Sequence, residues 1–324
     1  MSRVFSLYKL HFTAPLHISD SRDDYGVSLT TYSSDAMYAA LTASLAKLGE
    51  TIPNDGDIGC CISSLYPYYQ ESDKDVPVFF FPKPLAMKMP LLSDPTPAKK
   101  IKKVCWLDKS CMELILNGQS LFKGDECVGK IDRTFLSERG VDPGFICSEV
   151  SERATVSRCG EDAAPFYMDR VYFSGHSGLF FLVDGDTSAV DRAMPLLALE
   201  GIGTDRTVGN GLFEYEKARF EISVPDESEY GVCLSTFIPE NKEQLEIFLN
   251  ASDYAYDLSR RGGWITSEPY LGLRKNAIYV FNPGSVFKSA KNGMGRIVDL
   301  SPSGLLSHPT WRCGKAIVLP YKND

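Results

Sequence analysis

Residues 201–211 have the composition of a loop that a ligand approaches closely. The stretch reads Gly-Ile-Gly-Thr-Asp-Arg-Thr-Val-Gly-Asn-Gly, with glycines at positions 201, 203, 209 and 211 and an arginine at 206. Glycine has no Cβ and tolerates a positive φ, so successive backbone N–H groups can turn toward one anion. A helix-capping glycine would explain Gly201 but not the other three. The stretch therefore predicts a ligand-facing loop.

The elements on either side of this loop exclude the two commonest phosphate-binding motifs. Residues 188–199 carry an apolar stripe at helical spacing, and residues 213–222 alternate loosely as a strand does. A dinucleotide fingerprint needs a strand before its loop, and a third glycine where Arg206 stands. A P-loop needs four residues between its glycines and then Lys, whereas five residues separate Gly203 from Gly209 and Asn210 follows.

Four histidines, at positions 11, 17, 176 and 308, are the candidates for acid–base chemistry. His17 is the best placed, in a loop after the first strand, where it could act as general acid or base. A single histidine is more often structural, and the spacing shows no partner base or lysine. Asp20, Asp23 and Asp24 could form a metal site or a catalytic loop, but such residues more often make turns. Because no metal-ligand spacing occurs, we expect neither metal nor cofactor.

The protein is acidic overall but contains one basic segment. The formal net charge is −8, which opposes nucleic-acid binding in general but leaves a local basic groove open. Nine Lys or Arg and six Asp or Glu lie between residues 99 and 139. The densest part contains Lys99, Lys100, Lys102 and Lys103. These lysines are candidates for contact with a phosphate backbone or a neighbouring subunit, with an ordinary solvated surface as the alternative.

Residues 1–225 have the element order of a βαββαβ ferredoxin-like unit. We expect a strand at 4–12, a helix that Ser34 caps and Gly49 closes, paired strands at 166–173 and 178–183, and a helix at 188–199. The helix at 188–199 contains Pro195, which predicts a kink. Proline punctuates residues 50–100, and residues 84–148 have the character of an insertion.

A polar break at residues 225–229 begins a second unit, residues 226–324. Strands at 231–238, 254–258, 278–281 and 315–319 and a helix at 242–249 repeat the order strand, helix, strands. Arg260, Arg261 and Trp264 form either a stacking corner or a buried turn. The fold class expected for the whole chain is α+β, with two tandem ferredoxin-like (RRM-like) domains.

Composition indicates the compartment. Hydrophobic residues make up 44% of 324 residues, which is typical of a globular chain with room for two domains. The nine cysteines are scattered without a Cys-x-x-Cys pair, and no apolar run reaches membrane length. The first ten residues lack the features of a secretory signal. We therefore expect a cytoplasmic protein with reduced thiols and no membrane contact.

In combination, five stretches resemble a known family. The pattern Gly201-x-Gly203-x-x-Arg206-x-x-Gly209-x-Gly211 is similar to the C-terminal glycine-rich loop of the RAMP superfamily of CRISPR RNA-binding proteins. Four further stretches resemble the 5′-handle-binding RAMP subunits of type III-A (Csm) effector complexes, with Ser33 where that family has His. These are residues 10–18 (LHFTAPLHI), 33–41 (SSDAMYAAL), 261–264 (RGGW) and 284–287 (GSVF).

The resemblance implies a fold, a ligand and two protein partners. It implies tandem ferredoxin-like domains, with residues from about 85 to 150 as a thumb-like projection. It further implies a non-catalytic subunit in antiviral defence that holds the repeat-derived 5′ handle of the CRISPR RNA. The implied partners are the large polymerase-like signalling subunit and the backbone RAMP subunit, and no contact with DNA is implied.

Carried onto this sequence, the resemblance gives a set of candidate RNA-binding residues. The loop would supply backbone N–H groups to phosphate. Arg206 would supply a guanidinium that makes bidentate hydrogen bonds or stacks on a base. Asp205 could instead hold its own loop, and Asn210 either reads a base edge or occupies the left-handed region. Arg153 and Arg158, five apart, would face opposite sides of one strand. The candidates are Gly201, Gly203, Asp205, Arg206, Gly209, Asn210, Gly211, Arg153, Arg158, His17, Ser33, Ser34, Lys99, Lys100, Lys102, Lys103, Arg261 and Trp264.

Three alternatives remain open from the sequence. One is a RAMP endoribonuclease that processes CRISPR precursor RNA, with His17 as acid or base. Another is the equivalent subunit of a type III-B complex. The third is an unrelated two-domain protein whose acidic surface serves only assembly with other proteins.

Overall fold

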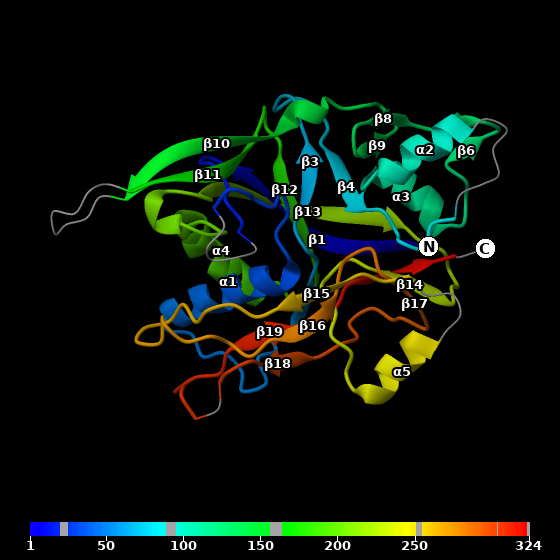
Figure 1. Ribbon diagram of the computed structural model, residues 1–324. Helices are drawn as coiled ribbons and strands as arrows, with labels where there is room; N and C mark the ends of the chain where they lie inside the picture. The colour runs from blue at the N-terminus through cyan, green and yellow to red at the C-terminus, as the bar shows by residue number, and fades with distance from the viewer. Residues whose placement is uncertain (20–24, 89–94, 156–163, 251–254, 303, 323–324) are drawn as a thin grey trace.

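One large sheet organises the described part of the chain (Figure 1). The computed structural model describes residues 1–19, 25–88, 95–155, 164–250, 255–302 and 304–322. Within these ranges, a nine-stranded sheet, one three-stranded sheet, four two-stranded sheets and five α-helices form a mixed structure, which confirms the α+β class. No helix in these ranges is long and apolar enough to cross a membrane.

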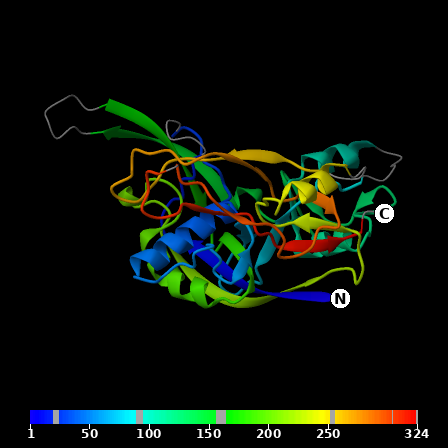
Figure 2. The same ribbon diagram turned by 90° about the horizontal axis from the view of Figure 1, so that it is seen from below.

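Four antiparallel strands form the first half of the large sheet, in the order β13-β1-β12-β3. The strands and their bounds are β1 (Ser2–Phe12), β3 (Tyr66–Tyr69), β12 (Gly178–Gly185) and β13 (Phe213–Ser223), with β2 (Cys60–Ile62) also paired to β12. Helices α1 (Ser34–Lys47) and α4 (Ser188–Glu200) pack together against one face of these strands (Figures 1 and 2). The expected strand at 4–12 and the expected helices at 34–49 and 188–199 are confirmed.

Alternation along β1 separates two hydrophobic cores. Successive side chains of a strand point to opposite faces, so Phe5 and Leu7 join one core while Tyr8 and Leu10 join the other. The second core lies under α1 and α4, and it contains Met37, which is fully buried. Leu199 departs from the expected apolar stripe of α4 because it is 79% exposed.

The segment expected as a projection instead extends the large sheet. Its elements are α2 (Pro95–Lys103), β5 (Trp106–Asp108), α3 (Lys109–Leu116), β6 (Phe122–Lys123), β7 (Glu126–Cys127), β8 (Lys130–Asp132), β9 (Phe135–Ser137) and η1 (Pro143–Phe145), and the strand before it is β4 (Val78–Pro82). Strands β4, β5, β9 and β8 continue the sheet, with β5 and β9 parallel. Leu107 and Met112 are buried in the same core as Phe5 and Leu7, which ties this segment to the body of the molecule.

A two-stranded ribbon projects from the body in both views (Figures 1 and 2). It consists of β10 (Ile146–Thr155) and β11 (Ala164–Phe173), paired over ten residues. The expected pairing of 166–173 with 178–183 is therefore wrong, because β11 pairs with β10 while β12 lies between β1 and β3. Residues 174–177 lead from the ribbon back into the large sheet rather than closing a hairpin.

The second unit is more fragmented than the first. Its elements are β14 (Tyr230–Cys233), α5 (Lys242–Asn250), β15 (Leu258–Arg261), β16 (Ile278–Phe281), β17 (Val286–Lys288), β18 (Ile297–Asp299), β19 (Trp311–Cys313) and β20 (Val318–Tyr321). They form three small sheets, β17-β14-β20, β15-β16 and β18-β19. The expected strand at 231–238 ends early, at Cys233.

Polar contacts join the two units after β14 and before β20. Ser235 Oγ donates to the Ile62 carbonyl at 2.7 Å, and the hydroxyls of Thr236 and Ser34 lie 2.7 Å apart. The Lys315 ammonium contacts the Asp57 carboxylate at 2.8 Å. These side chains belong to opposite units, so the docking of the second unit on the first is specified by particular donors and acceptors.

Candidate nucleic-acid interface

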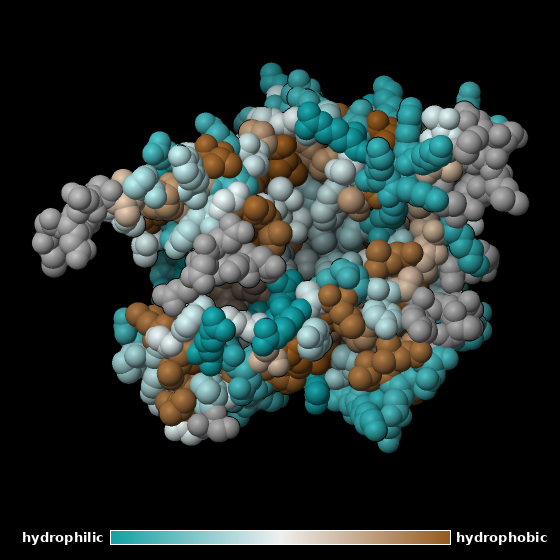
Figure 3. Space-filling view, in the orientation of Figure 1, coloured by the Kyte–Doolittle hydropathy of each residue, from teal (hydrophilic) through white to brown (hydrophobic). Residues whose placement is uncertain are grey.

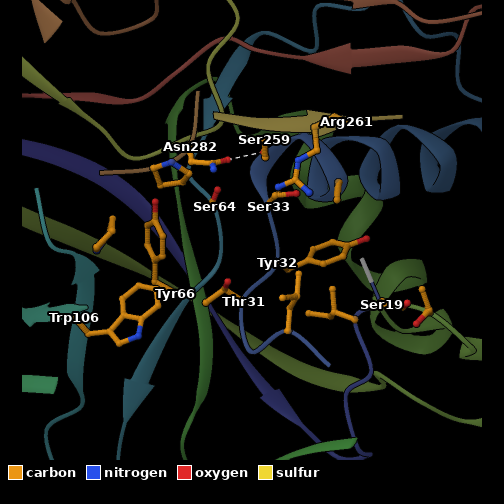
Figure 4. A pocket seen from close by; sticks show the side chains of 17 residues that line it. Ser19, Thr31, Tyr32, Ser33, Ser64, Tyr66, Trp106, Ser259, Arg261 and Asn282 are labelled. Atoms are coloured by element: carbon orange, nitrogen blue, oxygen red, sulfur yellow. Dashed lines mark hydrogen bonds between the residues drawn. The ribbon is translucent and has the colours of Figure 1, made fainter. Parts of the chain in front are cut away.

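A cleft of about 550 Å³ lies where the two units meet. Its walls come from the segment after β1, the start of α1, strands β3 to β5, the glycine-rich loop, and the ends of β15 and β16 (Figure 4). Figure 3 shows this face of the molecule hollowed near its centre. Of the candidate residues, Gly203, Ser33 and Arg261 line the cleft together, from three distant parts of the chain.

The glycine-rich loop is docked on the segment after β1. Thr204 donates to the His17 carbonyl from its backbone N–H at 2.8 Å and from its hydroxyl at 3.2 Å. Gly203 has a φ of +91°, and a Cβ there would lie 2.4 Å from the same carbonyl oxygen. Glycine is therefore required at Gly203 both for its conformation and for its close approach to another backbone.

The base and the rim of the loop differ in exposure. Gly201 and Gly211 are buried at the base, where Ile202 N–H donates to the Gly211 carbonyl at 3.0 Å. At the rim, Asp205 has a φ of +53° and precedes the short 3₁₀ helix η2 (Arg206–Val208), while Gly209 is exposed. The Arg206 side chain is 37% exposed, 3.9 Å from the Glu200 carboxylate and 3.4 Å from the Gly201 carbonyl. Among the described contacts, Asp205 makes no side-chain cap to η2, so the expectation that it fixes its own loop finds no support.

A buried carboxylate stands at the start of α1, behind the cleft wall. Asp35 is fully buried and forms ion pairs with Arg312, which is also buried, and with Arg261, whose Nε lies 3.8 Å from Asp35 Oδ2. Burial alone would raise the pKa of the Asp35 carboxyl, but the guanidinium groups of Arg312 and Arg261 outweigh it and hold the pKa below the ordinary value. Lys275 belongs to the same cluster, and burial with the Arg312 charge lowers its pKa from 10.5 to about 8.

The opposite wall of the cleft carries amide and hydroxyl groups. Asn282 accepts a hydrogen bond from Ser259 Oγ at 2.7 Å, the contact drawn in Figure 4, and donates to Asp257 at 2.8 Å. Arg261 points from this wall toward Ser33 (Figure 4). This wall therefore presents a guanidinium beside neutral polar groups.

Aromatic side chains form the floor. Tyr66 is buried, its hydroxyl donates to the Leu234 carbonyl, and its ring centroid lies 5.9 Å from that of Trp106. Tyr32 is half-buried near the glycine-rich loop, and burial raises the pKa of its phenol. Aromatic faces beside a guanidinium are what a single-stranded nucleic acid requires for its bases and phosphates.

The described lining of the cleft is mostly uncharged. The described residues around the cleft include one charged side chain, Arg261, and neither histidine, cysteine nor carboxylate. A nucleophile with an adjacent base is thus not assembled within this described lining. Across the described residues of the chain, no group of three His, Cys, Asp or Glu could hold a metal ion.

Three of the candidates are buried, so their side chains do not face a ligand. His17 is fully buried, with Nδ1 2.7 Å from the Asp169 carbonyl, and its own carbonyl supports the loop. Ser34 is buried in the contact with Thr236, and Ser33 rather than Ser34 is the N-cap of α1. Asn210 is buried with its amide near Met168 Sδ at 3.7 Å. Asn210 also lacks the positive φ that was one interpretation of it, because the described non-glycine residues with positive φ are Arg133, Asp205 and Ser289.

The four lysines of the basic segment lie outside the cleft lining. All four are exposed on α2, where Ile101 is the residue that packs into the core. Hydrophilic side chains gather on this side of the molecule, over α2 and α3 (Figure 3). The arrangement agrees with the solvated-surface alternative for Lys99, Lys100, Lys102 and Lys103.

The remaining candidates are also away from the cleft lining. Arg153 lies on the projecting ribbon, half-buried, with its guanidinium 3.9 Å from Met168 Sδ. Arg158 lies outside the described residues. The ring of Trp264 is covered by the Arg274 guanidinium at 4.7 Å from its centroid. Trp264 is half-buried, and the guanidinium that the structure shows over its ring is that of Arg274.

The sequence did not indicate several residues that build the cleft. No sequence pattern marks Trp106 or Asn282, and Asp35, which lies behind the cleft wall, belongs only to the stretch 33–41 that carries the resemblance. The pairing of Asp35 with Arg312 spans 277 residues, so no local pattern could reveal it. An acidic residue in the first turn of a helix was the one available signal, since it is stabilised there by the helix dipole.

Comparison with known proteins gives a consistent result. Residues 226–321 match the family model of the CRISPR Csm4 C-terminal domain. The CRISPR system Cms protein Csm4 of Thermococcus onnurineus (strain NA1) is 28% identical over 252 residues, which cover 74% of this chain and 74% of that protein.

Solved structures share the fold. The structure of the Csm3–Csm4 subcomplex in the type III-A CRISPR-Cas interference complex matches with a TM-score of 0.62 at 16% identity, covering 99% of this chain and 100% of that chain. A Csm1–Csm4 cassette in complex with pppApA matches with a TM-score of 0.60 at 19% identity, covering 99% and 98%. The resemblance to the type III-A RAMP subunits is confirmed.

Proposed function

We propose that this chain holds the repeat-derived 5′ end of the CRISPR RNA in a type III-A effector complex, as a non-catalytic and cytoplasmic subunit. The observation that carries the proposal is the cleft, in which Gly203 and Thr204, the start of α1 and Arg261 meet. The Arg261 guanidinium can pair with phosphate, and the half-buried rings of Tyr32 and Trp106 offer aromatic faces to bases.

The strand order supports the finer fold assignment for the first unit. With β2 and β3 taken together as the second strand, β13-β1-β12-β3 places the fourth, first, third and second strands of a βαββαβ unit side by side, all antiparallel. Both helices cover one face, as that unit requires. For the second unit we retain a ferredoxin-like relationship as a proposal, with β14, α5 and β20 as its core.

The partners follow from the relatives. Proteins with this fold are joined to Csm1 in one set of structures and to Csm3 in another. We propose that this chain likewise contacts a large signalling subunit and a backbone RAMP subunit. The acidic net charge of −8 suits a chain most of whose surface meets protein while one cleft meets RNA.

A binding titration tests the proposal. The full chain is titrated against a labelled single-stranded RNA with the repeat-derived 5′ end, and against a scrambled RNA of equal length. We expect tighter binding of the repeat-derived RNA and a log–log salt slope of roughly −0.7 for each phosphate contact. We expect Arg206→Ala to weaken binding about five-fold with the melting temperature little changed, because its guanidinium is partly exposed at the loop rim.

Arg219→Ala is the matched control, since Arg219 is an exposed arginine on β13, outside both the glycine-rich loop and the cleft lining. Equal affinity for both RNAs, with Arg206→Ala no different from Arg219→Ala, would contradict the proposal. RNA cleaved to a defined product in EDTA would contradict its non-catalytic part.

A further inference from the structure

The strongest unassigned feature is the excess of positive charge around Asp35. One fully buried carboxylate faces Arg312, Arg261 and Lys275. Of these three cations, only Arg261 lines the cleft. Its side chain is 23% exposed, and its buried Nε has no hydrogen-bond partner among the described residues.

Asp35 reaches Arg261 by two routes. The direct route is electrostatic, with 3.8 Å between Asp35 Oδ2 and Arg261 Nε. The second runs through Arg312, whose Nη1 pairs with the same Oδ2 while its Nη2 donates to the Gly262 carbonyl at 3.1 Å. Because Gly262 follows Arg261 directly, Asp35 restrains both the side chain of Arg261 and the backbone beside it.

We infer that Asp35 is a positioning residue: it aims the Arg261 guanidinium into the cleft toward an RNA phosphate. The inference rests on the proposed function, since it names how one wall of that site is oriented. The structural reason is that Asp35 belongs to α1 of the first unit, whereas Arg261 and Arg312 belong to the second. The Arg261 side chain is therefore oriented toward the cleft only when the second unit is docked on α1.

The sign of one effect separates this role from simple electrostatics. Asp35→Asn removes a negative charge close to the cleft, so charge alone would make RNA bind more tightly. A positioning role predicts weaker RNA binding. The Arg261 guanidinium loses its orientation in this variant and no longer makes its charge-assisted hydrogen bonds with the phosphate. A role confined to stability predicts a lower melting temperature with unchanged affinity well below that temperature.

A double-mutant cycle on the full chain tests the inference. RNA affinity is measured at pH 7 and 0.15 M salt for wild type, Arg261→Ala, Asp35→Asn and the double variant. We expect about ten-fold weaker binding for Arg261→Ala, about five-fold for Asp35→Asn, and no further loss in the double variant. Asp57→Asn is the control, because it removes another carboxylate that pairs across the two units, with Lys315, but whose partner does not line the cleft. This control should leave RNA affinity unchanged.

The RNA affinities of the folded variants decide whether the inference holds. Tighter or unchanged binding by folded Asp35→Asn, or losses that add in the double variant, overturns the inference. Unchanged binding by Arg261→Ala overturns the assigned RNA site itself, which is a separate failure. If Asp35→Asn does not fold, Arg312→Lys replaces it in the cycle. Lysine keeps the positive charge but cannot contact Asp35 and the Gly262 carbonyl with two nitrogens at once, as the guanidinium does. We then expect a loss of about three-fold that depends on Arg261, and an additive loss overturns the inference.

Discussion

The glycine-rich loop and the lysines of helix α2 are both candidate RNA contacts, the loop by its glycine content and family resemblance and the lysines by their charge, but their surroundings in the structure differ. Three glycines of the loop, Gly201, Gly203 and Gly211, approach neighbouring backbone too closely for any Cβ. The lysines of α2 are exposed, and the core needs only Ile101 from that stretch. A cluster of glycines indicates a loop whose backbone must pack closely against another segment, and the fold has to provide that contact. A cluster of lysines by itself indicates only a solvent-exposed surface, because it does not identify a binding partner.

The largest effect should come from adding one methyl group to the loop. Gly203→Ala places a Cβ against the His17 carbonyl at a φ of +91°, so the loop must leave the segment after β1 and lose the Thr204 hydrogen bond. We expect a loss of about 3–4 kcal/mol in the free energy of unfolding, measured by urea denaturation. Gly209→Ala is the matched control, since its φ is +86° with open space around the Cβ. There we expect only the conformational cost of about 1–2 kcal/mol. Equal losses would contradict the docking argument.

A smaller effect is expected for Lys275, which is half-buried, unlike the exposed lysines of α2. The pKa of Lys275 is about 8 in the folded protein against an ordinary 10.5, so the folded state penalises its protonated form. Its contribution to the free energy of unfolding therefore rises with pH between about 8 and 10.5. RNA affinity should change the other way, falling about two- to three-fold from pH 7 to 9.5 as the charge is lost. Titrations at several pH values check this, and Lys275→Met should flatten the change in affinity. A wild-type affinity that stays constant over this range would show that the charge of Lys275 does not reach the bound RNA.

The smallest effect is expected for α2. Replacing Lys99, Lys100, Lys102 and Lys103 by alanine should change the RNA affinity of the full chain by less than about two-fold at 0.15 M salt, because exposed charges outside the cleft are screened. A loss as large as that of Arg261→Ala would remove the contrast between the two regions. Weakened assembly with partner subunits at unchanged RNA affinity would instead identify α2 as a protein contact.

Local patterns predicted the parts of the fold that depend on local chemistry. Helix α1, strand β1 and the glycine-rich loop were identified from spacing and glycine content, because capping, alternation and positive φ are set by neighbouring residues. The burial of His17, Ser34 and Asn210 was missed, since it depends on contacts with residues distant in sequence. The cluster of Asp35, Arg312 and Arg261 was missed for the same reason. The pairing of residues 166–173 with 178–183 was predicted wrongly because a short connection between two strands favours a hairpin, whereas β11 pairs with the preceding strand β10.

The central position of β1 also has a consequence for biosynthesis. Its last residue is Phe12, yet its partners β12 and β13 begin at Gly178 and Phe213. At a synthesis rate of about 5–20 residues per second, β1 waits roughly 10–35 s for its first neighbour. Throughout that interval it has apolar side chains on both faces and two unpaired edges, which is the form of a strand most prone to association with other chains. The nascent chain is therefore expected to depend on chaperones more than its final packing suggests.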